Sequence, residues 1–297
     1  MASDLITTYK SFNVEKTSYG TPRVNARGGK SIKILDAKKN TLVLSTPLIL
    51  TWGINKIVDE DTGRTDFNFS LQFPSSDYGT AATNEFFEKM KNLESKILDD
   101  VVTNAKEWFG KAKMSREVAE ALFTPMLKYP KDKATNEPDY SRSPTMRIKI
   151  PCWDGKFNIE LYNTENKPIF TPSTELGSTP FESLIPKGSH VSAAIQCNGL
   201  WFAAGKFGVT WQLVQAIVRR PVRIQGGCFL KLSDEDIKVV NDANTREAEE
   251  IQEDEQPSDN DDGVNVEDSD DDTPPTPPPE PKKKVTKRRV VKKKSSD

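Results

Sequence analysis

The charge distribution at the C-terminal end limits the folded part of this sequence more than any other feature. Residues 245–280 contain fifteen acidic residues and one basic residue, and residues 281–297 contain nine basic residues and one acidic residue. A segment with this composition and almost no hydrophobic residues cannot bury a core. We therefore expect one folded domain over residues 1–242, a disordered acidic and proline-rich linker over 243–280, and a disordered basic tail over 281–297.

The net charge of the chain describes this tail more than the folded domain. The whole chain has 42 basic and 44 acidic residues, a net charge of −2. Ten of the basic and sixteen of the acidic residues follow residue 244, so the preceding part carries 32 and 28, a net charge of +4. That part has the size of one large domain with an ordinary core.

The cysteines and the apolar runs indicate where the chain resides. The three cysteines are widely spaced and contain no CxxC pair, which favours a reducing compartment. The N-terminus lacks an apolar run of signal-peptide length, and no stretch approaches the ~20 apolar residues of a membrane span. We expect a soluble protein that is neither secreted nor bound to membranes.

The hydrophobic pattern predicts a mainly β protein with a helical insertion over residues 84–124. Strand-like segments cover 41–58 and 64–74, and Asp154-Gly155 and Asn198-Gly199 are two-residue hairpin signals between later strands. Apolar residues recur every three or four positions from Phe86 to Trp108, as on one helix face, with Thr83 as a plausible N-cap and Gly110 as the C-terminal glycine. Short antiparallel strands favour a barrel or a sandwich.

Catalytic and metal sites find little support in the sequence. The single histidine, His190, has no recognisable nucleophile partner, and its spacing to the cysteines matches no zinc site. We expect core cysteines. "GGKS" at 28–31 resembles the end of a phosphate-binding loop, but the required earlier glycine is Val24. "DEDTG" at 59–63 has its glycine one position early for a calcium loop. We expect no enzyme activity and no cofactor.

A long interval without acidic residues points to a polyanionic ligand. No Asp or Glu occurs between Glu182 and Asp234, whereas six basic residues and several aromatic residues do. Basic groups can track phosphates, and aromatic faces can stack bases. The alternative is that these aromatic residues fill a core, and half of those in alternating strands must do so. The candidate nucleic-acid-binding residues here are Trp201, Lys206, Phe207, Trp211, Arg219, Arg220, Arg223 and Lys231.

Two further basic groups are weaker candidates. The first lies at the end of the predicted long helix and consists of Trp108, Phe109, Lys111, Lys113 and Arg116. The second is Lys128, Lys131 and Lys133 in the loop after the helices. Ordinary helix-end and loop charges would look the same.

The tail admits three interpretations. Its acidic part could compete for a nucleic-acid groove or bind partner proteins, and its basic end resembles a nuclear localisation signal or a DNA-binding arm. The third interpretation is a solvated polyampholyte. The basic residues concerned are Lys282, Lys283, Lys284, Lys287, Arg288, Arg289, Lys292, Lys293 and Lys294.

Whole segments of the sequence resemble a known family. "TPLILTWGINK", "SPTMRIKIPCWDGKFNIELYN" and "LIPKGSHVSAAIQCNGLWFAAGKFGVTWQLVQAIV" are similar to the single-stranded DNA-binding proteins of nucleocytoplasmic large DNA viruses. The similarity covers about residues 40–232. It implies an OB-fold-like β-barrel with helical additions, and a link with single-stranded DNA and virion packaging.

Together these observations favour a sequence-nonspecific single-stranded DNA-binding protein of viral DNA replication, repair or packaging. RNA, or duplex DNA through the tail, could also bind, and viral replication or virion proteins and a second copy of the chain are further expected partners. The expected location is the virion and the infected cell, in the nucleus or a cytoplasmic virus factory. The alternative is a structural virion protein that contacts the capsid or the packaged genome without a dedicated groove.

Overall fold

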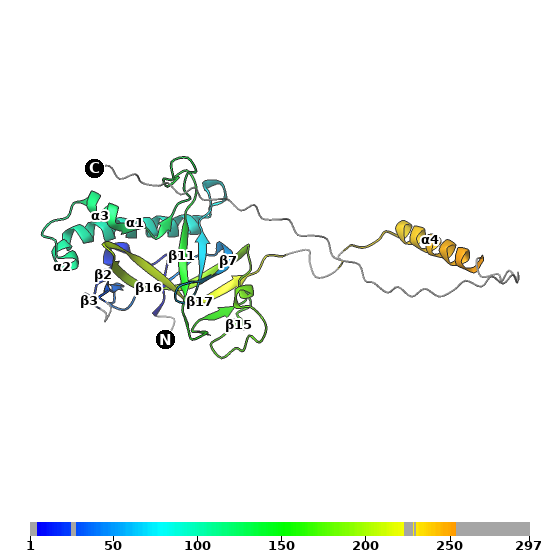
Figure 1. The fold of residues 1–297 in the computed structure, drawn as a ribbon. Coiled ribbons are helices and arrows are strands. Elements are labelled where there is room, and N and C mark those ends of the chain that lie inside the picture. Colours follow the sequence, from blue (N-terminus) through cyan, green and yellow to red (C-terminus); the bar gives the residue numbers. More distant parts are fainter. Residues whose placement is uncertain (1–4, 25–27, 223–227, 229, 254–297) are drawn as a thin grey trace, which may run out of the picture. The chain divides into compact units, whose positions relative to one another are not determined.

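The computed structural model describes residues 5–24, 28–222, 228 and 230–253 (Figure 1). The chain divides into two units, residues 1–226 and 227–297. The first unit contains the sheets and three α-helices, and the described structure of the second is helix α4 (Asp234–Glu253). None of the helices in the described residues is long and apolar enough to cross a bilayer.

Five strands form the centre of the large sheet, and their pairings close on themselves. They are β7 (Ile49–Val58), β8 (Thr65–Gln72), β11 (Thr145–Ile150), β16 (Ser189–Ala203) and β17 (Lys206–Arg219). β7, β8 and β11 are antiparallel neighbours, β11 pairs in parallel with β17, and β17 pairs with β16. Because β16 also pairs with β7, the circuit returns to its start.

Short strands extend this sheet or pair beside it. Those that join it are β1 (Thr7–Thr8), β3 (Arg23–Val24), β4 (Lys30–Ile32), β6 (Val43–Ser45), β9 (Phe123–Thr124), β10 (Leu127–Lys128), β14 (Glu160–Tyr162) and β15 (Pro168–Phe170). Two separate pairs are β2 (Ser18–Tyr19) with β5 (Ile34–Leu35), and β12 (Cys152–Trp153) with β13 (Lys156–Phe157). The prediction of a mainly β protein with some helices is confirmed.

The helices lie between β8 and β11 in the sequence, as predicted. They are α1 (Ala81–Thr103), α2 (Ala105–Phe109) and α3 (Arg116–Leu122). The 3-10 turn η3 (Ser76–Tyr78) precedes α1, whereas η2 (Val14–Lys16) and η4 (Phe181–Leu184) lie in other parts of the sequence. The predicted N-cap was wrong: Thr80 caps α1, and Thr83 completes the capping box three residues later. Gly110 ends α2 with a positive φ of 67°, as the sequence indicated.

The two predicted hairpin turns have different outcomes. Asp154 and Gly155 have φ angles of 49° and 74° and connect β12 to β13, as expected for this turn. Asn198 and Gly199 do not form a turn, because they lie in an irregularity within the continuous strand β16. The chain reverses instead at Ala204 and Gly205, whose φ angles are 49° and 75°.

The irregularity at Gly199 exists because another strand lies against it. A Cβ atom at Gly199 would lie 2.1 Å from the carbonyl oxygen of Ile32, and the φ angle is 90°. We expect Gly199→Ala to lower the free energy of unfolding by about 2 kcal/mol or more, through strain and a displaced β4. Urea denaturation would measure this loss. The matched control is Gly63→Ala, which has a similar φ but open space around it, and should cost less. Equal losses in both variants would contradict the close approach.

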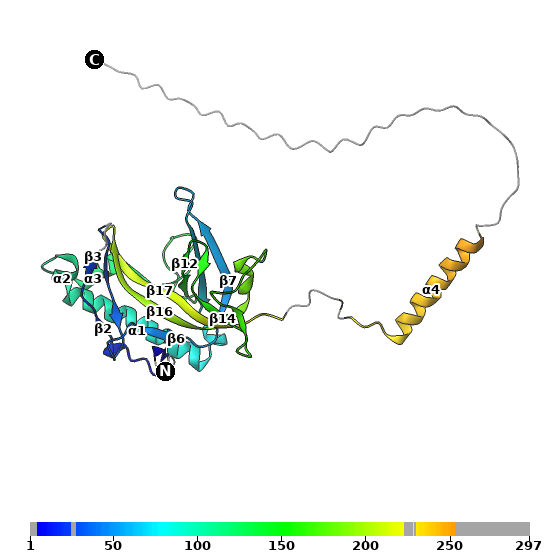
Figure 2. The ribbon, with the colours of Figure 1, turned by 90° about the horizontal axis from the view of Figure 1, so that it is seen from below.

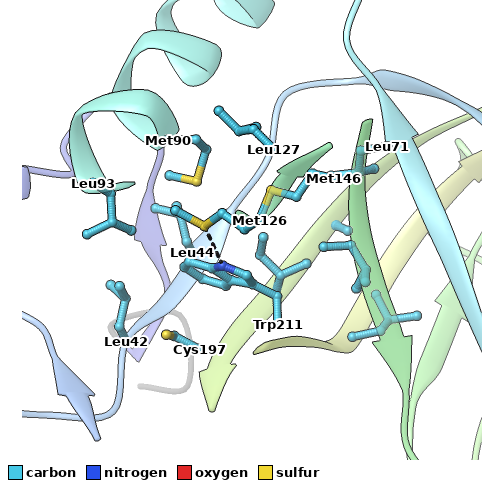
Figure 3. Close-up of a cluster of buried hydrophobic side chains, with 14 of the residues drawn as sticks. Leu42, Leu44, Leu71, Met90, Leu93, Met126, Leu127, Met146, Cys197 and Trp211 are labelled. Atoms are coloured by element: carbon cyan, nitrogen blue, oxygen red, sulfur yellow. Dashed lines mark hydrogen bonds between the residues drawn. The ribbon is translucent and has the colours of Figure 1, made fainter. Parts of the chain in front are cut away.

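The core lies between the inner side of the sheet and α1. The apolar face of α1 is buried, and Trp211 of β17 points toward Met90 and Leu93 of that helix, beside Met126 (Figure 3). The indole Nε1–H of Trp211 donates to Met126 Sδ at 3.2 Å. Partly buried Glu94 accepts hydrogen bonds from the backbone N–H groups of Met126 and Leu127, which holds this segment against α1, and the loss of solvent around the Glu94 carboxyl raises its pKa.

The second unit contains a helix where the composition predicted a loss of structure. α4 begins after Ser233, whose hydroxyl accepts a hydrogen bond from the backbone N–H of Asp236. Three acidic residues in its first turn interact favourably with the helix dipole. The helix therefore crosses the expected domain end at 242. The rest of the predicted linker and the basic tail, from residue 254, lie outside the described residues.

Candidate nucleic-acid interface

Three of the predicted stacking residues are core residues. Phe207 is fully buried, and the exposed fractions of Trp211 and Trp108 are 1% and 4%. Phe207 packs between Phe109 and Phe123, and Trp108 contacts Tyr19 edge to face. None of these rings can stack a base without unfolding, so their assignment to the binding site was wrong. The alternating pattern of β17 turns residues 207, 211 and 213 to the core.

Trp201 is the predicted aromatic residue that lies on the opposite side of the sheet. It pairs with Gly208 across the β16–β17 hairpin and remains partly exposed. Its neighbour Phe202 turns inward and packs against Phe109 and Phe207. This agrees with the expectation that half of the aromatic residues in alternating strands face the core.

The predicted basic residues that the structure describes in the first unit are exposed but lie at different places. Lys206 follows the turn of the β16–β17 hairpin, whereas Arg219 and Arg220 lie at the other end of β17 and Lys111 and Lys113 follow α2. Lys231 is exposed in the second unit. Arg223 and the tail residues Lys282 to Lys294 lie outside the described residues. Arg220 Nη2 donates to the carbonyl of Leu184 at 3.3 Å.

The side of the five strands that faces away from the core is here called the outer face. Register places Asn68 of β8, Lys149 of β11 and Gln212 of β17 side by side on it, and Trp201 pairs with Gly208 further along β17. Figure 2 shows the β7–β8 hairpin and the far ends of β16 and β17 rising on the same side of the molecule, with α1 along the other side.

A groove of about 390 Å³ lies on the outer face, beside the β12–β13 hairpin. We call it the β8–β11 groove. Residues from several strands line it, among them Ile57, Arg64, Arg147, Lys149, Trp153 and Gln212. The indole of Trp153 is 76% exposed, which is unusual for so large an apolar ring. An exposed ring beside cations is the arrangement that single-stranded nucleic acids favour.

Strand alternation explains why two cations enter this groove from β11. Met146, Ile148 and Ile150 of that strand are buried, so the residues between them, Arg147 and Lys149, must point outward. Residues two apart in a strand are about 6.7 Å apart. Successive phosphates of an extended single strand have a comparable separation, so the two cations can contact neighbouring phosphates.

The positive charge of the groove is only partly neutralised by the protein. Arg64 Nη2 lies 3.1 Å from Asp66 Oδ1, in a pair that is more than half exposed and therefore weak. Among the described residues, neither Arg147 nor Lys149 has an acidic partner within ion-pair distance. The lining side chains thus leave a formal charge of +2 without a counterion.

Lys128 extends this positive region along β11. It pairs with Thr145 at the start of that strand, and its ammonium group is close enough to interact electrostatically with Arg147. Burial, and then the positive charge of Arg147, lower the pKa of the Lys128 ammonium. An anion placed between the two cations would relieve this repulsion.

No group of three His, Cys, Asp or Glu residues that could hold a metal occurs in the part of the chain that the structure describes. His190 is a partly buried strand residue that pairs with Arg219. Of the expected core cysteines only Cys197 is buried, which raises the pKa of its thiol to about 12. Cys152, the first residue of β12, is partly buried and lines the groove, and Cys228 is exposed.

The sequence analysis missed Arg64, Arg147, Lys149 and Trp153. A signal for two of them was present, because "TMRIKIPCW" alternates apolar and basic residues through Arg147 and Lys149. Trp153 stands directly before the Asp154-Gly155 turn, where a side chain is easily exposed. The predicted site was a run of basic residues close together in the sequence, whereas the basic residues of the groove lie on different strands.

No protein-family model matches this sequence, and no curated protein sequence matches it significantly. Among solved structures, the chain is similar to the single-stranded DNA-binding protein from bacteriophage Enc34 in complex with ssDNA. The identity is 12%, the TM-score 0.36, and the match covers 69% of this chain and 98% of that chain. The chain is also similar to gp2.5, a single-stranded DNA-binding protein encoded by bacteriophage T7. There the identity is 15%, the TM-score 0.34, and the coverage 63% and 91%.

Proposed function

We propose that this protein binds single-stranded DNA without sequence preference, through the β8–β11 groove. The observation that supports this most strongly is the groove itself, where Arg147 and Lys149 have no acidic partner among the described residues and lie beside the exposed ring of Trp153. Cations without counterions repel one another and cost stability, so their function is best explained by an anionic ligand. The exposed ring favours unpaired bases, because a duplex hides its base faces.

The closed circuit of five strands supports an OB-fold-like barrel as the scaffold. In such a fold the first three strands are antiparallel, the third pairs in parallel with the fifth, and the fourth and fifth form a hairpin. Taken in chain order, β7, β8, β11, β16 and β17 have these pairings. OB-folds bind oligonucleotides on strands two and three and on the two flanking hairpin loops. Here these are β8, β11 and the turns at 59–64 and 204–205, and the groove lies among the first three.

The resemblance of residues 40–232 to viral single-stranded DNA-binding proteins supports a narrower proposal. We propose that the protein acts in viral DNA replication, repair or packaging, within the infected cell or the virion. The basic tail is proposed as a second contact with nucleic acid.

Wild-type binding to oligo-dT at two salt concentrations tests the function. Three groove cations predict that affinity falls at least about tenfold between roughly 50 and 200 mM salt, since each phosphate contact on a single strand adds about 0.7 to the slope of log K against log salt. A fluorescence anisotropy titration of the full chain measures this. If the protein did not bind oligo-dT at low salt, the proposed function would be contradicted, and the alternative of a structural virion protein would be favoured.

The stacking contribution is tested by Trp153→Ala. Loss of one stacked base costs about 1–3 kcal/mol, so we expect affinity for oligo-dT to fall by about 5- to 150-fold. The ring is 76% exposed, and thermal unfolding should therefore be nearly unchanged. Tyr140→Ala is the matched control, because Tyr140 is 74% exposed but lies outside the groove. An equal effect of both variants would contradict the assignment of Trp153.

A further inference from the structure

We propose that the outer face holds a second base-stacking subsite at Trp201, and that a bound strand reaches it from the β8–β11 groove along β17. This rests on the proposed function, since it adds a second contact to the same ligand. The second subsite would determine how many nucleotides of single-stranded DNA one protein molecule covers, because the groove alone binds only part of that length.

The indole of Trp201 is held against the backbone of its neighbouring strand. A Cβ atom on Gly208 would lie 2.9 Å from Cζ2 and 3.1 Å from Cε2 of Trp201, so the ring occupies the space that any other residue at 208 would fill. Trp201 is partly exposed, so part of the ring is accessible to a ligand. A ring fixed in this way loses little entropy when a base stacks on it.

Cations flank this ring, as they flank Trp153 in the groove. Trp201 pairs with Ser31 of β4, which in turn pairs with Arg23 of β3. Lys206 precedes Gly208 by two residues and therefore lies on the same side of β17. Arg23 and Lys206 are both exposed. Arg23 lies in the segment 16–35 and Lys206 in the segment 183–233, and neither segment contains an acidic residue.

The path between the two sites is polar and continuous. Gln212 lines the groove and pairs with Lys149, and Thr210 and Gly208 follow on the same side of β17. The carbonyl Oε1 of Gln212 accepts a hydrogen bond of 3.0 Å from Asn198 Nδ2, which leaves the Gln212 amide N–H groups for a base or phosphate. Gln212 and Gly208 are four positions apart in an extended strand, a span of roughly 13 Å, which is enough for about two further nucleotides.

Oligo-dT strands of different lengths test this proposal with the full-length protein. Strands of roughly 4, 8, 12 and 16 nucleotides cover the site sizes known for OB-folds. We expect Trp201→Leu, which keeps apolar bulk over Gly208 but removes the aromatic face, to bind the shortest strand as the wild type does. For the longer strands it should lose about fivefold or more in affinity. Trp201→Phe keeps a stacking face and should retain most of the gain with length.

Trp153→Ala provides the comparison that separates this proposal from the function itself. It should weaken binding at every length, because it acts in the groove. Absence of wild-type binding at any length overturns the proposed function. If the wild type binds and Trp153→Ala weakens it, but Trp201→Leu equals the wild type at all lengths, the second subsite is overturned. Equal loss at every length in Trp201→Leu also overturns it, since Trp201 would then act on the groove. Near-ultraviolet circular dichroism of each variant verifies that the sheet is intact.

Discussion

Replacing Arg147 and Lys149 together by alanine is expected to weaken binding to oligo-dT roughly 50- to 100-fold at about 50 mM salt. The reason is that both cations face the groove, have no acidic partner in the described ranges of the chain, and have a spacing suited to successive phosphates. Removing two phosphate contacts should also reduce the slope of log K against log salt by about 1.4. Anisotropy titrations over a salt series measure both quantities.

The matched control for this variant is Arg219→Ala with Arg220→Ala. It removes the same formal charge at the C-terminal end of β17, away from the groove. Both arginines are exposed, and the sequence had predicted them as nucleic-acid-binding residues. We expect a much smaller loss of affinity there. Since neither Arg147 nor Lys149 forms an ion pair within the part of the chain that the structure describes, their double variant should unfold at the temperature of the wild type or slightly higher. A larger effect of the control pair would move the binding site to that end of β17.

The second large effect concerns stability, and we expect it from Trp211→Ala. Trp211 is 1% exposed and packs against α1 beside Met126 (Figure 3), so its truncation leaves a large cavity. The free energy of unfolding should fall by about 3–5 kcal/mol, a large part of the stability of a domain. Urea denaturation measures this loss. Trp211→Phe should cost less, because it refills part of the cavity.

Trp153→Ala is the control for that experiment too, because it removes an equally large ring from an exposed position. Its unfolding free energy should change by no more than about 0.5 kcal/mol. If Trp211→Ala were as stable as the wild type, the burial of this ring between sheet and helix would be contradicted.

Sequence patterns predicted the parts of this fold that depend on neighbouring residues. The spacing of Phe86, Met90 and Leu93 predicted the buried face of α1, and the Asp154-Gly155 pair predicted the turn between β12 and β13. The Asn198-Gly199 pair has the same local signal but a different outcome, because β4 lies against it. That contact joins residues more than 160 positions apart, and no local pattern contains it.

The site could be predicted only in part for the same reason. Trp201 and Trp211 are ten residues apart in an acid-free segment, yet one lies on the outer face and the other in the core. The shift of register near Asn198 changes which residues of β16 and β17 face each other, so sequence alternation alone does not assign them. Arg64 and Trp153 line the same groove only because the β7–β8 and β12–β13 hairpins both border it.

Photo-crosslinking gives the most direct test of binding at the groove. A single strand that contains 5-bromodeoxyuridine would be irradiated with the full-length protein, and the crosslinked peptides would be identified by mass spectrometry. Our account predicts crosslinks in the segment from Arg147 to Trp153, lost in the Trp153→Ala variant. Crosslinks confined to the basic tail at 281–297, or to the segment from Arg219 to Lys231, would contradict it.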